Sequence, residues 1–340
     1  MSKPLAEHRG LLDVLAQLGG FELARVITTR LPKILMYHRL GNRADPRKTD
    51  VAAFSRQMEH IARRWRVISL TELCEALRSA RPVTRNAVIL TFDDAYADFY
   101  EFAFPILSRL RLAATLYVPS AFVDGQIWLW PDRLRFVFEN ASATSVVLQL
   151  NGGIRQWRLD TPEASFKAWN DVADHLLTLR STEREAKIDE IARELAVRVP
   201  ERPIAECRAL TWDQIREVAA NGIEIGSHTC AHARLAIEDV EEQRQQIVNS
   251  KYRIEEMLQI PVRHFSYPHG GREDFTPATR ALVGKAGYES AVVGFSDARI
   301  LDDVLALRRY SVLNSRLNFK KAVSGWRWIG ARLGEIQMGQ

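Results

Sequence analysis

The stretch VILTFDDAYADFY, residues 88–100, begins as a buried strand and ends on two adjacent acids. Val88, Ile89 and Leu90 are apolar and mostly β-branched, which is typical of a strand buried on both faces. Asp93 and Asp94 follow where the chain should leave the core. Neighbouring carboxylates repel each other and are costly to bury unpaired, so we expect a cation or a chemical role at this strand end.

Strand-like apolar runs alternate with helix-like segments on both sides of this stretch. The predicted strands cover residues 34–38, 66–70, 87–92, 114–118, 223–228, 263–268 and 290–295. The predicted amphipathic helices cover residues 52–65, 71–80, 99–110, 211–222, 241–259 and 276–287. This alternation implies a parallel sheet, and seven or eight such units imply a (β/α) barrel. An open doubly wound sheet is the alternative, although the GxGxxG fingerprint that it often carries is absent.

Residues 124–206 interrupt the alternation. They contain a Trp-rich stretch, a predicted hairpin over residues 145–159 and a charged helical run from about 162 to 197. We expect a mixed α+β insertion after the fourth strand, either a cap over the barrel mouth or a peripheral addition. The predicted organisation is an N-terminal helical segment (1–32), the first part of the barrel (33–123), the insertion (124–206), the second part of the barrel (207–315) and a C-terminal amphipathic tail (316–340).

The composition is that of an ordinary globular protein, with 46% hydrophobic and 26% charged residues in a chain of 340. No apolar run is long enough to predict a transmembrane helix, and the N-terminus lacks the pattern of a secretory signal peptide. The three cysteines form no CxxC pair, so we expect reduced thiols in a cytoplasmic protein.

The net charge of +5 is spread among nearly as many acids as bases, which favours a solvated surface over a nucleic-acid-binding stripe. Only residues 318–334, NFKKAVSGWRWIGARLG, combine clustered basic residues with tryptophans. Such a helix could lie on the inner face of an anionic membrane. The alternative is a terminal helix that packs on the body through its tryptophans.

Several predicted strands end in side chains that can bind metals or transfer protons. His38 ends the first strand, Asp93 and Asp94 follow the third, and His228 ends the strand at 223–228. In a parallel barrel the carboxyl ends of the strands form the active site, so these side chains should converge.

The segment HTCAH places His228 and His232 four residues apart, and one helical turn would set both imidazoles on the same side. Two histidines and one carboxylate, with a position left for water, make a catalytic zinc site. One of the two aspartates could complete that set while the other acts as a general base. Each feature also has a structural explanation: helix capping by the acids, or surface and core histidines.

Three segments resemble motifs of the polysaccharide deacetylase family, the NodB-homology enzymes of carbohydrate esterase family 4. They are TFDDAYADFYEFAFPIL (91–107), LTWDQIREVAANGIEIGSHTCAH (210–232) and FSYPHG (265–270). ILMYHRL (34–40) resembles the branch acting on poly-N-acetylglucosamine, in which the catalytic-acid histidine precedes the TFDD motif. The resemblance implies a distorted (β/α)7 barrel and metal-dependent removal of N-acetyl groups from amino sugars.

The resemblance also implies roles for single residues. By matching position, Asp93 is the general base, Asp94, His228 and His232 bind the metal, His38 is the general acid, the backbone N–H of His269 helps hold the oxyanion, and Tyr267 and Pro268 bind substrate. The expected metal is Zn²⁺, with Co²⁺, Ni²⁺ or Mn²⁺ as alternatives.

The sequence departs from the family pattern at three points. Ala95 replaces the usual glycine after TFDD, and no histidine follows His269, so the C-terminal LxH motif is missing. The arginine that usually orients the base is absent near Ser266. We predict that Arg309 substitutes for it by pairing with Asp93, the alternative being a surface arginine.

Trp128 and Trp130 open the insertion, where they could stack on sugar rings or be buried in a cap. The leading hypothesis is an N-deacetylase acting on an amino-sugar glycan or a lipid-linked glycan precursor, located in the cytoplasm with peripheral membrane contact through the C-terminal tail. A deformylase of a lipid-linked amino sugar and a glycan-binding pseudoenzyme are the alternatives. A non-haem Fe(II) oxygenase is disfavoured, because its strand pattern is not found.

Overall fold

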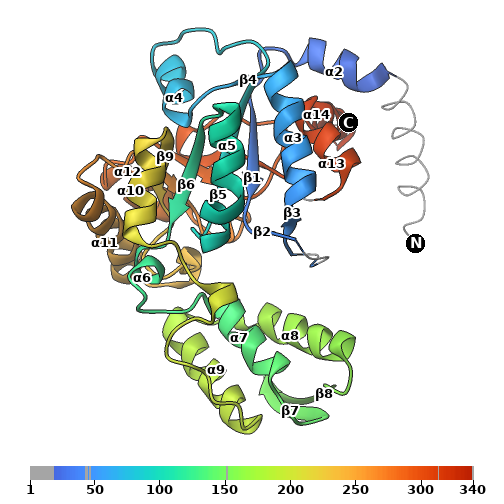
Figure 1. The fold of residues 1–340 in the computed structure, drawn as a ribbon, viewed down its shortest axis with the longest axis vertical. Helices are drawn as coiled ribbons and strands as arrows, with labels where there is room; N and C mark the ends of the chain where they lie inside the picture. The colour runs from blue at the N-terminus through green and yellow to red at the C-terminus, as the bar shows by residue number, and fades with distance from the viewer. Residues whose placement is uncertain (1–18, 43–44, 46, 151, 313, 339–340) are drawn as a thin grey trace.

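A computed structural model of the chain describes residues 19–42, 45, 47–150, 152–312 and 314–338. Its centre is a parallel sheet with the strand order β12-β11-β10-β9-β6-β5-β1-β13, in which β4 also pairs with β5 (Figure 1). The strands are β1 (Lys33–Tyr37), β4 (Arg66–Val67), β5 (Ala87–Phe92), β6 (Ala114–Val118), β9 (Ile223–Ser227), β10 (His264–Ser266), β11 (Ser290–Val293), β12 (Leu307–Arg308) and β13 (Tyr310–Ser311).

The sheet curls until its two ends nearly meet. β12 pairs with β11 through Val293 and Arg308, and β13 pairs with β1 through Leu35 and Tyr310. Only Arg309 separates β12 from β13 in the chain, so the two ends of the strand order are held side by side. The distorted (β/α)7 barrel is therefore confirmed, and the open doubly wound sheet is excluded.

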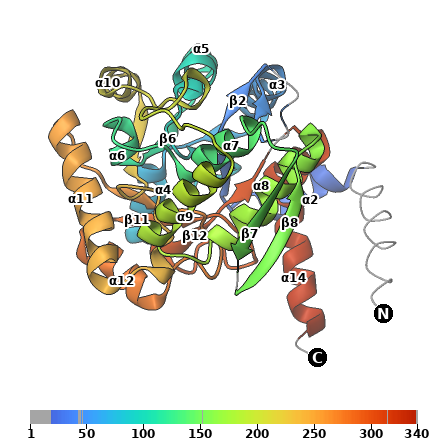
Figure 2. The same ribbon diagram turned by 90° about the horizontal axis from the view of Figure 1, so that it is seen from below.

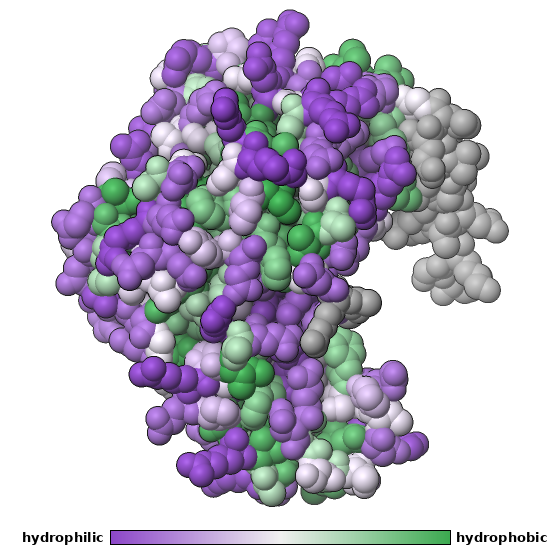
Figure 3. All heavy atoms as spheres, viewed as in Figure 1, coloured by the Kyte–Doolittle hydropathy of each residue, from purple (hydrophilic) through white to green (hydrophobic). Residues whose placement is uncertain are grey.

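Helices cover the outside of the barrel and carry polar residues outward on the face seen in Figure 3. They are α2 (Phe21–Ile27), α3 (Val51–Arg64), α4 (Leu70–Arg78), η2 (Phe99–Ala103), α5 (Phe104–Leu110), α6 (Ser120–Val123), α10 (Trp212–Ala220), α11 (Val240–Leu258), α12 (Pro277–Lys285), α13 (Arg316–Val323) and α14 (Trp326–Met338). Short pieces complete the barrel: β2 (Leu40–Gly41), β3 (Thr49–Asp50), and the single turns η3 (Ala205–Cys207), η4 (Leu235–Ile237) and η5 (Val304–Ala306). The Thr211 side chain caps α10 by accepting a hydrogen bond from the Gln214 N–H.

The strand predicted over residues 66–70 is too long. β4 ends at Val67, and Leu70 already begins α4. The Glu224 carboxylate accepts hydrogen bonds from the N–H groups of Leu70 and Thr71, at 3.0 and 3.1 Å. The first N–H groups of a helix have no acceptor within the helix. Here the acceptor is Glu224 of β9, which is 154 residues from Leu70 in the chain, so no local sequence pattern reveals it.

The insertion forms its own small hydrophobic core. It consists of α7 (Trp130–Glu139), the antiparallel hairpin β7 (Ser145–Leu150) and β8 (Gly153–Arg158), α8 (Pro162–Leu176) and α9 (Ser181–Glu194). Leu134, Val172 and Ile188 are among the side chains buried at its centre.

The insertion lies over the end of the barrel at which the strands finish (Figures 1 and 2). The Tyr96 hydroxyl, after β5, donates to Asp132 of α7 at 2.6 Å. The Arg234 guanidinium, after β9, donates to the Leu177 carbonyl at 3.0 Å. Of the two placements that the sequence left open, the structure has the one over the barrel mouth.

The tryptophans of α14 pack on the body of the protein. The Trp328 indole N–H donates to the Ala298 carbonyl at 2.9 Å, and Trp326 meets Phe21 of α2 edge to face. Both rings are half-buried and contact the body of the protein, and membrane contact through this helix stays a prediction. Among the described helices, none combines the length and the apolar character that crossing a bilayer requires.

Candidate active site

Asp94, His228 and His232 converge where β5 and β9 end. One ligand atom from each of the three side chains lies within 4.8 Å of the others. Asp94 Oδ1 is 3.5 Å from His228 Nε2 and 3.3 Å from His232 Nε2. The structure therefore brings together the three side chains that were predicted to share a metal ion.

The segment that carries the two histidines is not helical. Residues 229–231 form a turn, and Thr229 and His232 have positive φ angles of 65° and 54°. The side-chain carbonyl of Gln246 accepts the N–H groups of Cys230 and Ala231, at 3.1 and 2.9 Å, and so holds the turn. The predicted helical turn was wrong, but the tight turn still faces the two imidazoles toward one point, with ring centres 4.8 Å apart.

The protonation of His228 is set by its neighbour Ser266. His228 Nδ1 lies 2.7 Å from the Ser266 carbonyl, which can only accept, so Nδ1 carries a proton and the lone pair of the neutral ring is on Nε2, which faces Asp94. Asp94 Oδ1 is buried and has no hydrogen-bond partner. An orphaned carboxylate oxygen beside two imidazole nitrogens fits a divalent cation, because these donors are the ones that zinc prefers.

The electrostatics of the cluster favour the metal-binding forms of Asp94 and His232. Burial alone would lower the pKa of His228, but Asp94 and Asp93 outweigh it and raise that pKa above its usual value. Burial alone would raise the pKa of Asp94, but the interactions with His228 and His232 hold it below its usual value. Burial lowers the pKa of His232 well below its usual value, and Asp94 opposes this only in part. Asp94 is thus kept as an ionised carboxylate and His232 as a neutral imidazole, the forms that bind metals.

Asp93 is held by Arg309 in a two-pronged ion pair. Both N–O distances, Nη1–Oδ1 and Nη2–Oδ2, are 2.7 Å, and both side chains are buried. The guanidinium also donates to the Val293 carbonyl, the Thr91 hydroxyl and the Ser266 hydroxyl, at 3.0, 3.2 and 3.0 Å. Burial would raise the pKa of Asp93, but the Arg309 charge outweighs it and leaves that pKa below the usual value. Arg309 therefore makes the contact that was predicted for it, and the surface-arginine alternative is excluded.

His38 stands on the open side of Asp93. It follows β1, its Nε2 lies 3.7 Å from Asp93 Oδ2, and its side chain is 41% exposed. A proton donor at this position can reach both the carboxylate and a ligand that approaches from solvent.

Of the three residues that follow β10, Tyr267 and Pro268 are buried, and His269 lies beside His232. Tyr267 is buried, stacks on Phe275 and donates its hydroxyl to the Leu305 carbonyl at 3.0 Å, and its expected role in substrate binding stays a prediction. Pro268 is also buried. His269 has a positive φ of 59°, and its ring centre lies 4.8 Å from that of His232. Its proposed role, through the backbone N–H, stays a prediction.

Trp128 and Trp130 are buried, with 5% and 3% of their surfaces exposed. The Trp128 indole donates to the Pro200 carbonyl at 3.1 Å, inside the insertion. Trp130 lies between the insertion and the barrel, with its ring centre 6.1 Å from that of His269. Neither offers an open face to a sugar ring in this structure, because both side chains are buried.

Sequence reasoning missed the part that Ser266 takes in this site. Its carbonyl orients His228, and its hydroxyl accepts from Arg309, so one residue ties the metal-ligand cluster to the base. The position had been noted only as lacking an arginine, and a serine at a strand end carries no signal of such a role.

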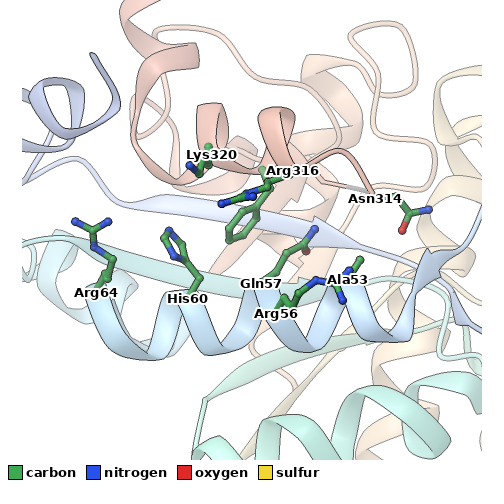
Figure 4. Close-up of a pocket in the computed structure, with 9 residues that line it drawn as sticks. Ala53, Arg56, Gln57, His60, Arg64, Asn314, Arg316 and Lys320 are labelled. Atoms are coloured by element: carbon green, nitrogen blue, oxygen red, sulfur yellow. The ribbon is translucent and has the colours of Figure 1, made fainter. Parts of the chain in front are cut away.

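A second concave surface lies on the outer wall of the barrel. A groove of about 710 Å³ runs between α3 and α13 and shares none of its lining with the catalytic cluster (Figure 4). The ionisable side chains of its lining are all basic: Arg56, His60, Arg64, Arg316 and Lys320.

Residues 170–291 match the family model described as polysaccharide deacetylase. A poly-β-1,6-N-acetyl-D-glucosamine N-deacetylase of Escherichia coli K12 is 39% identical over 57 residues, which are 17% of this chain and 8% of that relative. The sequence match thus spans only a small part of the curated relative's length.

Solved deacetylase structures share the fold over most of their length. The Streptococcus pyogenes deacetylase PplD, solved in complex with acetate, aligns over 83% of this chain and 92% of its own, with a TM-score of 0.54 and 18% identity. IcaB from Ammonifex degensii aligns over 87% of this chain and 97% of its own, with a TM-score of 0.54 and 16% identity. Residues 170–291 are thus similar in sequence to the polysaccharide deacetylase family, and the barrel shares its fold with solved structures such as PplD and IcaB.

Proposed function

We propose that this protein is a metal-dependent N-deacetylase that hydrolyses the N-acetyl group of an amino sugar in a glycan or lipid-linked glycan precursor. The observation that carries the proposal is the juxtaposition of two acids with different partners. Asp93 is paired with Arg309, whereas Asp94 faces His228 and His232. The two carboxylates can therefore do different work, one as a proton acceptor and the other as a ligand.

Asp94, His228 and His232 would hold the metal ion. When bound, a divalent cation supplies a Lewis acid for the amide carbonyl and lowers the pKa of water beside it. The donor set favours Zn²⁺, while Co²⁺, Ni²⁺ and Mn²⁺ also accept imidazole and carboxylate.

The other side chains of the site move protons. Asp93 is ionised, and its orientation is held by Arg309, so it can accept the proton of the attacking water as that oxygen bonds to the acetyl carbon. When the C–N bond then breaks, the amine nitrogen requires a proton, and His38 is placed on the exposed side to donate it. The products are acetate and a free amino sugar.

The relatives support a sugar amide as the substrate. The names of the E. coli relative and of PplD both state deacetylase activity, and the first also states poly-β-1,6-N-acetyl-D-glucosamine. We extend the activity, not the particular polymer, to this chain. Deformylation remains the chemical alternative, because the catalytic groups would treat a formamide in the same way.

The test is to incubate the metal-loaded protein with N-acetylated and N-formylated amino sugars and to measure acetate and formate separately. We expect acetate release that a chelator stops and added Zn²⁺ restores. Faster formate than acetate release would favour the deformylase, and metal binding without any hydrolysis would favour the pseudoenzyme.

We also propose peripheral contact with an anionic membrane, through α2 rather than through the α14 tryptophans. Leu23, Val26 and Ile27 of α2 are 62%, 64% and 60% exposed, and Leu333 of the neighbouring α14 is also exposed. The basic groove reaches this region, since a cavity bordered by α2 shares three of its residues, His60, Arg64 and Lys320. Apolar side chains next to basic ones suit a surface of acidic lipid headgroups. The cytoplasmic location stays a prediction.

A further inference from the structure

Arg184 of the insertion is a buried cation without an anionic partner. Its side chain is 1% exposed. Nη2 donates to the Ser181 hydroxyl at 3.1 Å, but Nε and Nη1 have no hydrogen-bond partner. Within the described part of the chain, Arg184 makes no direct ion pair; the Ser181 hydroxyl that it contacts donates in turn to the Glu238 carboxylate at 2.6 Å.

Two other buried arginines of this protein lie beside carboxylates. Arg309 is paired with Asp93 at 2.7 Å, and Arg135 lies 3.6 Å from Asp132. A buried charge without a partner is strongly unfavourable, because it loses hydration and gains nothing in return. Arg184 has the Ser181 hydroxyl and the face of the Trp130 ring as partners, and its Nε and Nη1 are left to bind a group from outside the chain.

Arg184 belongs to a cluster of unsatisfied polar atoms that reaches the catalytic side chains. Its guanidinium carbon lies 4.9 Å from the centre of the Trp130 ring, Trp130 is next to His269, and His269 is next to His232. Trp130 Nε1, His269 Nε2 and His232 Nδ1 are all buried without hydrogen-bond partners, as are the two Arg184 nitrogens. Apart from Asp94 Oδ1, the unsatisfied atoms of this cluster are nitrogens, and those of Arg184 and Trp130 can only donate.

An array of donors around one fixed positive charge selects an acceptor-rich anion. A guanidinium presents parallel N–H groups that match the oxygens of a carboxylate or a phosphate, and an indole N–H adds one more donor. We propose that Arg184 and Trp130 form an oxyanion subsite, which binds a carboxylate or phosphate group carried by the sugar substrate. This inference rests on the deacetylase function proposed above, because it assigns a part of that substrate.

The subsite also gives the insertion a role. Arg184 is on α9 and Trp130 begins α7, so both donors come from the insertion, whereas the catalytic groups come from the barrel. Entry of a sugar requires these two parts to separate, and the contacts that join them, such as Ser181 to Glu238 and Arg234 to Leu177, are polar and can exchange with water. An anion bound across the joint would favour the closed arrangement.

Binding can be tested without turnover. The full-length protein is unfolded thermally in inorganic phosphate and in chloride of equal ionic strength. We expect phosphate to stabilise the wild-type protein and Arg184→Met to lose that stabilisation. Arg193→Met removes an exposed arginine from the same helix and should respond like the wild type. Equal phosphate stabilisation of wild type and Arg184→Met, or none of the wild type, would overturn the inference.

Two conservative variants, which are less able to disturb folding, test the same subsite. Arg184→Lys keeps the charge but loses the paired donors, and Trp130→Phe keeps a ring but loses the N–H. Both should retain part of the phosphate stabilisation. A response of both variants equal to that of the wild type would contradict the subsite.

Comparison of kcat/KM between sugars then identifies the bound anion. It also distinguishes failure of the anion subsite from failure of the deacetylase function. The probes are N-acetylglucosamine 6-phosphate, N-acetylmuramic acid and uncharged N-acetylglucosamine oligomers. We expect kcat/KM to favour one of the anionic sugars by about tenfold or more, and Arg184→Met to abolish most of that preference. Hydrolysis with the same preference in both proteins would end the subsite inference alone. Phosphate binding that depends on Arg184, without hydrolysis of any N-acyl sugar, would support the subsite and count against the deacetylase.

Discussion

Arg309 and Asp93 are 216 residues apart in the chain, yet they form a buried two-pronged ion pair with N–O distances of 2.7 Å. The pair crosses the inside of the barrel from the β12–β13 junction to the end of β5. Arg309 thereby keeps Asp93 ionised and fixes the direction of its oxygens. The following predictions depend on this pair and on the cluster beside it.

Replacement of Arg309 by Met should impair catalysis through Asp93. Burial raises the pKa of Asp93 and Arg309 lowers it, so without Arg309 the carboxylate will take up a proton at higher pH. The acidic limb of the kcat/KM profile should therefore move to higher pH. The lost pair should also destabilise the protein by about 3–5 kcal/mol at neutral pH, an effect that decreases as pH falls and the wild-type Asp93 is protonated. Arg308→Met removes the neighbouring arginine, which pairs with Asp297, and should leave the profile in place.

The two acids should respond differently to the same substitution. Asp93→Asn removes the proton acceptor and should lower kcat by about 10²–10⁴-fold while the metal content is unchanged. Asp94→Asn removes a charged ligand and should lower the metal content measured by elemental analysis. Full activity of Asp93→Asn would show that the base has been assigned wrongly.

His38 should matter only where the leaving group requires a proton. His38→Gln should lower hydrolysis of an N-acetyl amino sugar by about 10²–10⁴-fold, because an amine leaves only when it is protonated. An aryl acetate ester releases a stable phenolate, so its hydrolysis should fall far less. Equal losses with both substrates would contradict the general-acid role.

Membrane binding should depend on α2. Replacing Leu23, Val26 and Ile27 together by Ser should weaken binding to vesicles that contain an acidic phospholipid by about tenfold or more, as judged by co-sedimentation. Ile154→Ser, which alters a 78% exposed side chain on β8 of the insertion, should bind as the wild type does. If Ile154→Ser lost vesicle binding and the triple α2 variant did not, the membrane contact would lie on the insertion and not on α2.

Lys33 should make stability depend on pH. It is fully buried at the start of β1, donates to the Thr28 carbonyl at 2.6 Å, and has a pKa lowered to about 7, mainly by burial and then by Arg25. Between about pH 7 and 10 the unfolded chain holds a proton that the folded chain has released, so stability should rise with pH by up to about 4 kcal/mol. Lys33→Met should remove this rise, whereas the exposed Lys285→Met should retain it; denaturant unfolding at several pH values would measure both.

Local sequence patterns predicted much of the fold and the site. The apolar run before Asp93 predicted β5 to the residue, and the strand ends correctly placed His38 and His228 on one face of the barrel. These features could be read because a strand, its buried faces and its exit from the core all depend on adjacent residues.

Other features depended on residues that meet only after the sheet has curled. The Asp93–Arg309 pair was predicted as one of two alternatives, and only closure of the barrel between β12 and β13 decided it. The early end of β4 depends on Glu224 from a distant strand. Local spacing suggested a helix for HTCAH, but hydrogen bonds from α11 select a tight turn instead.

The sequence by itself thus determined which strands form and which side chains stand at their ends, because those properties follow from neighbouring residues along the chain. Only the tertiary structure decided that Trp128 and Trp130 are buried and that Arg184 has no counter-charge. Burial and ion pairing depend on which distant surfaces come together, and the packing within the insertion and of Trp130 against His269 of the barrel determines it here.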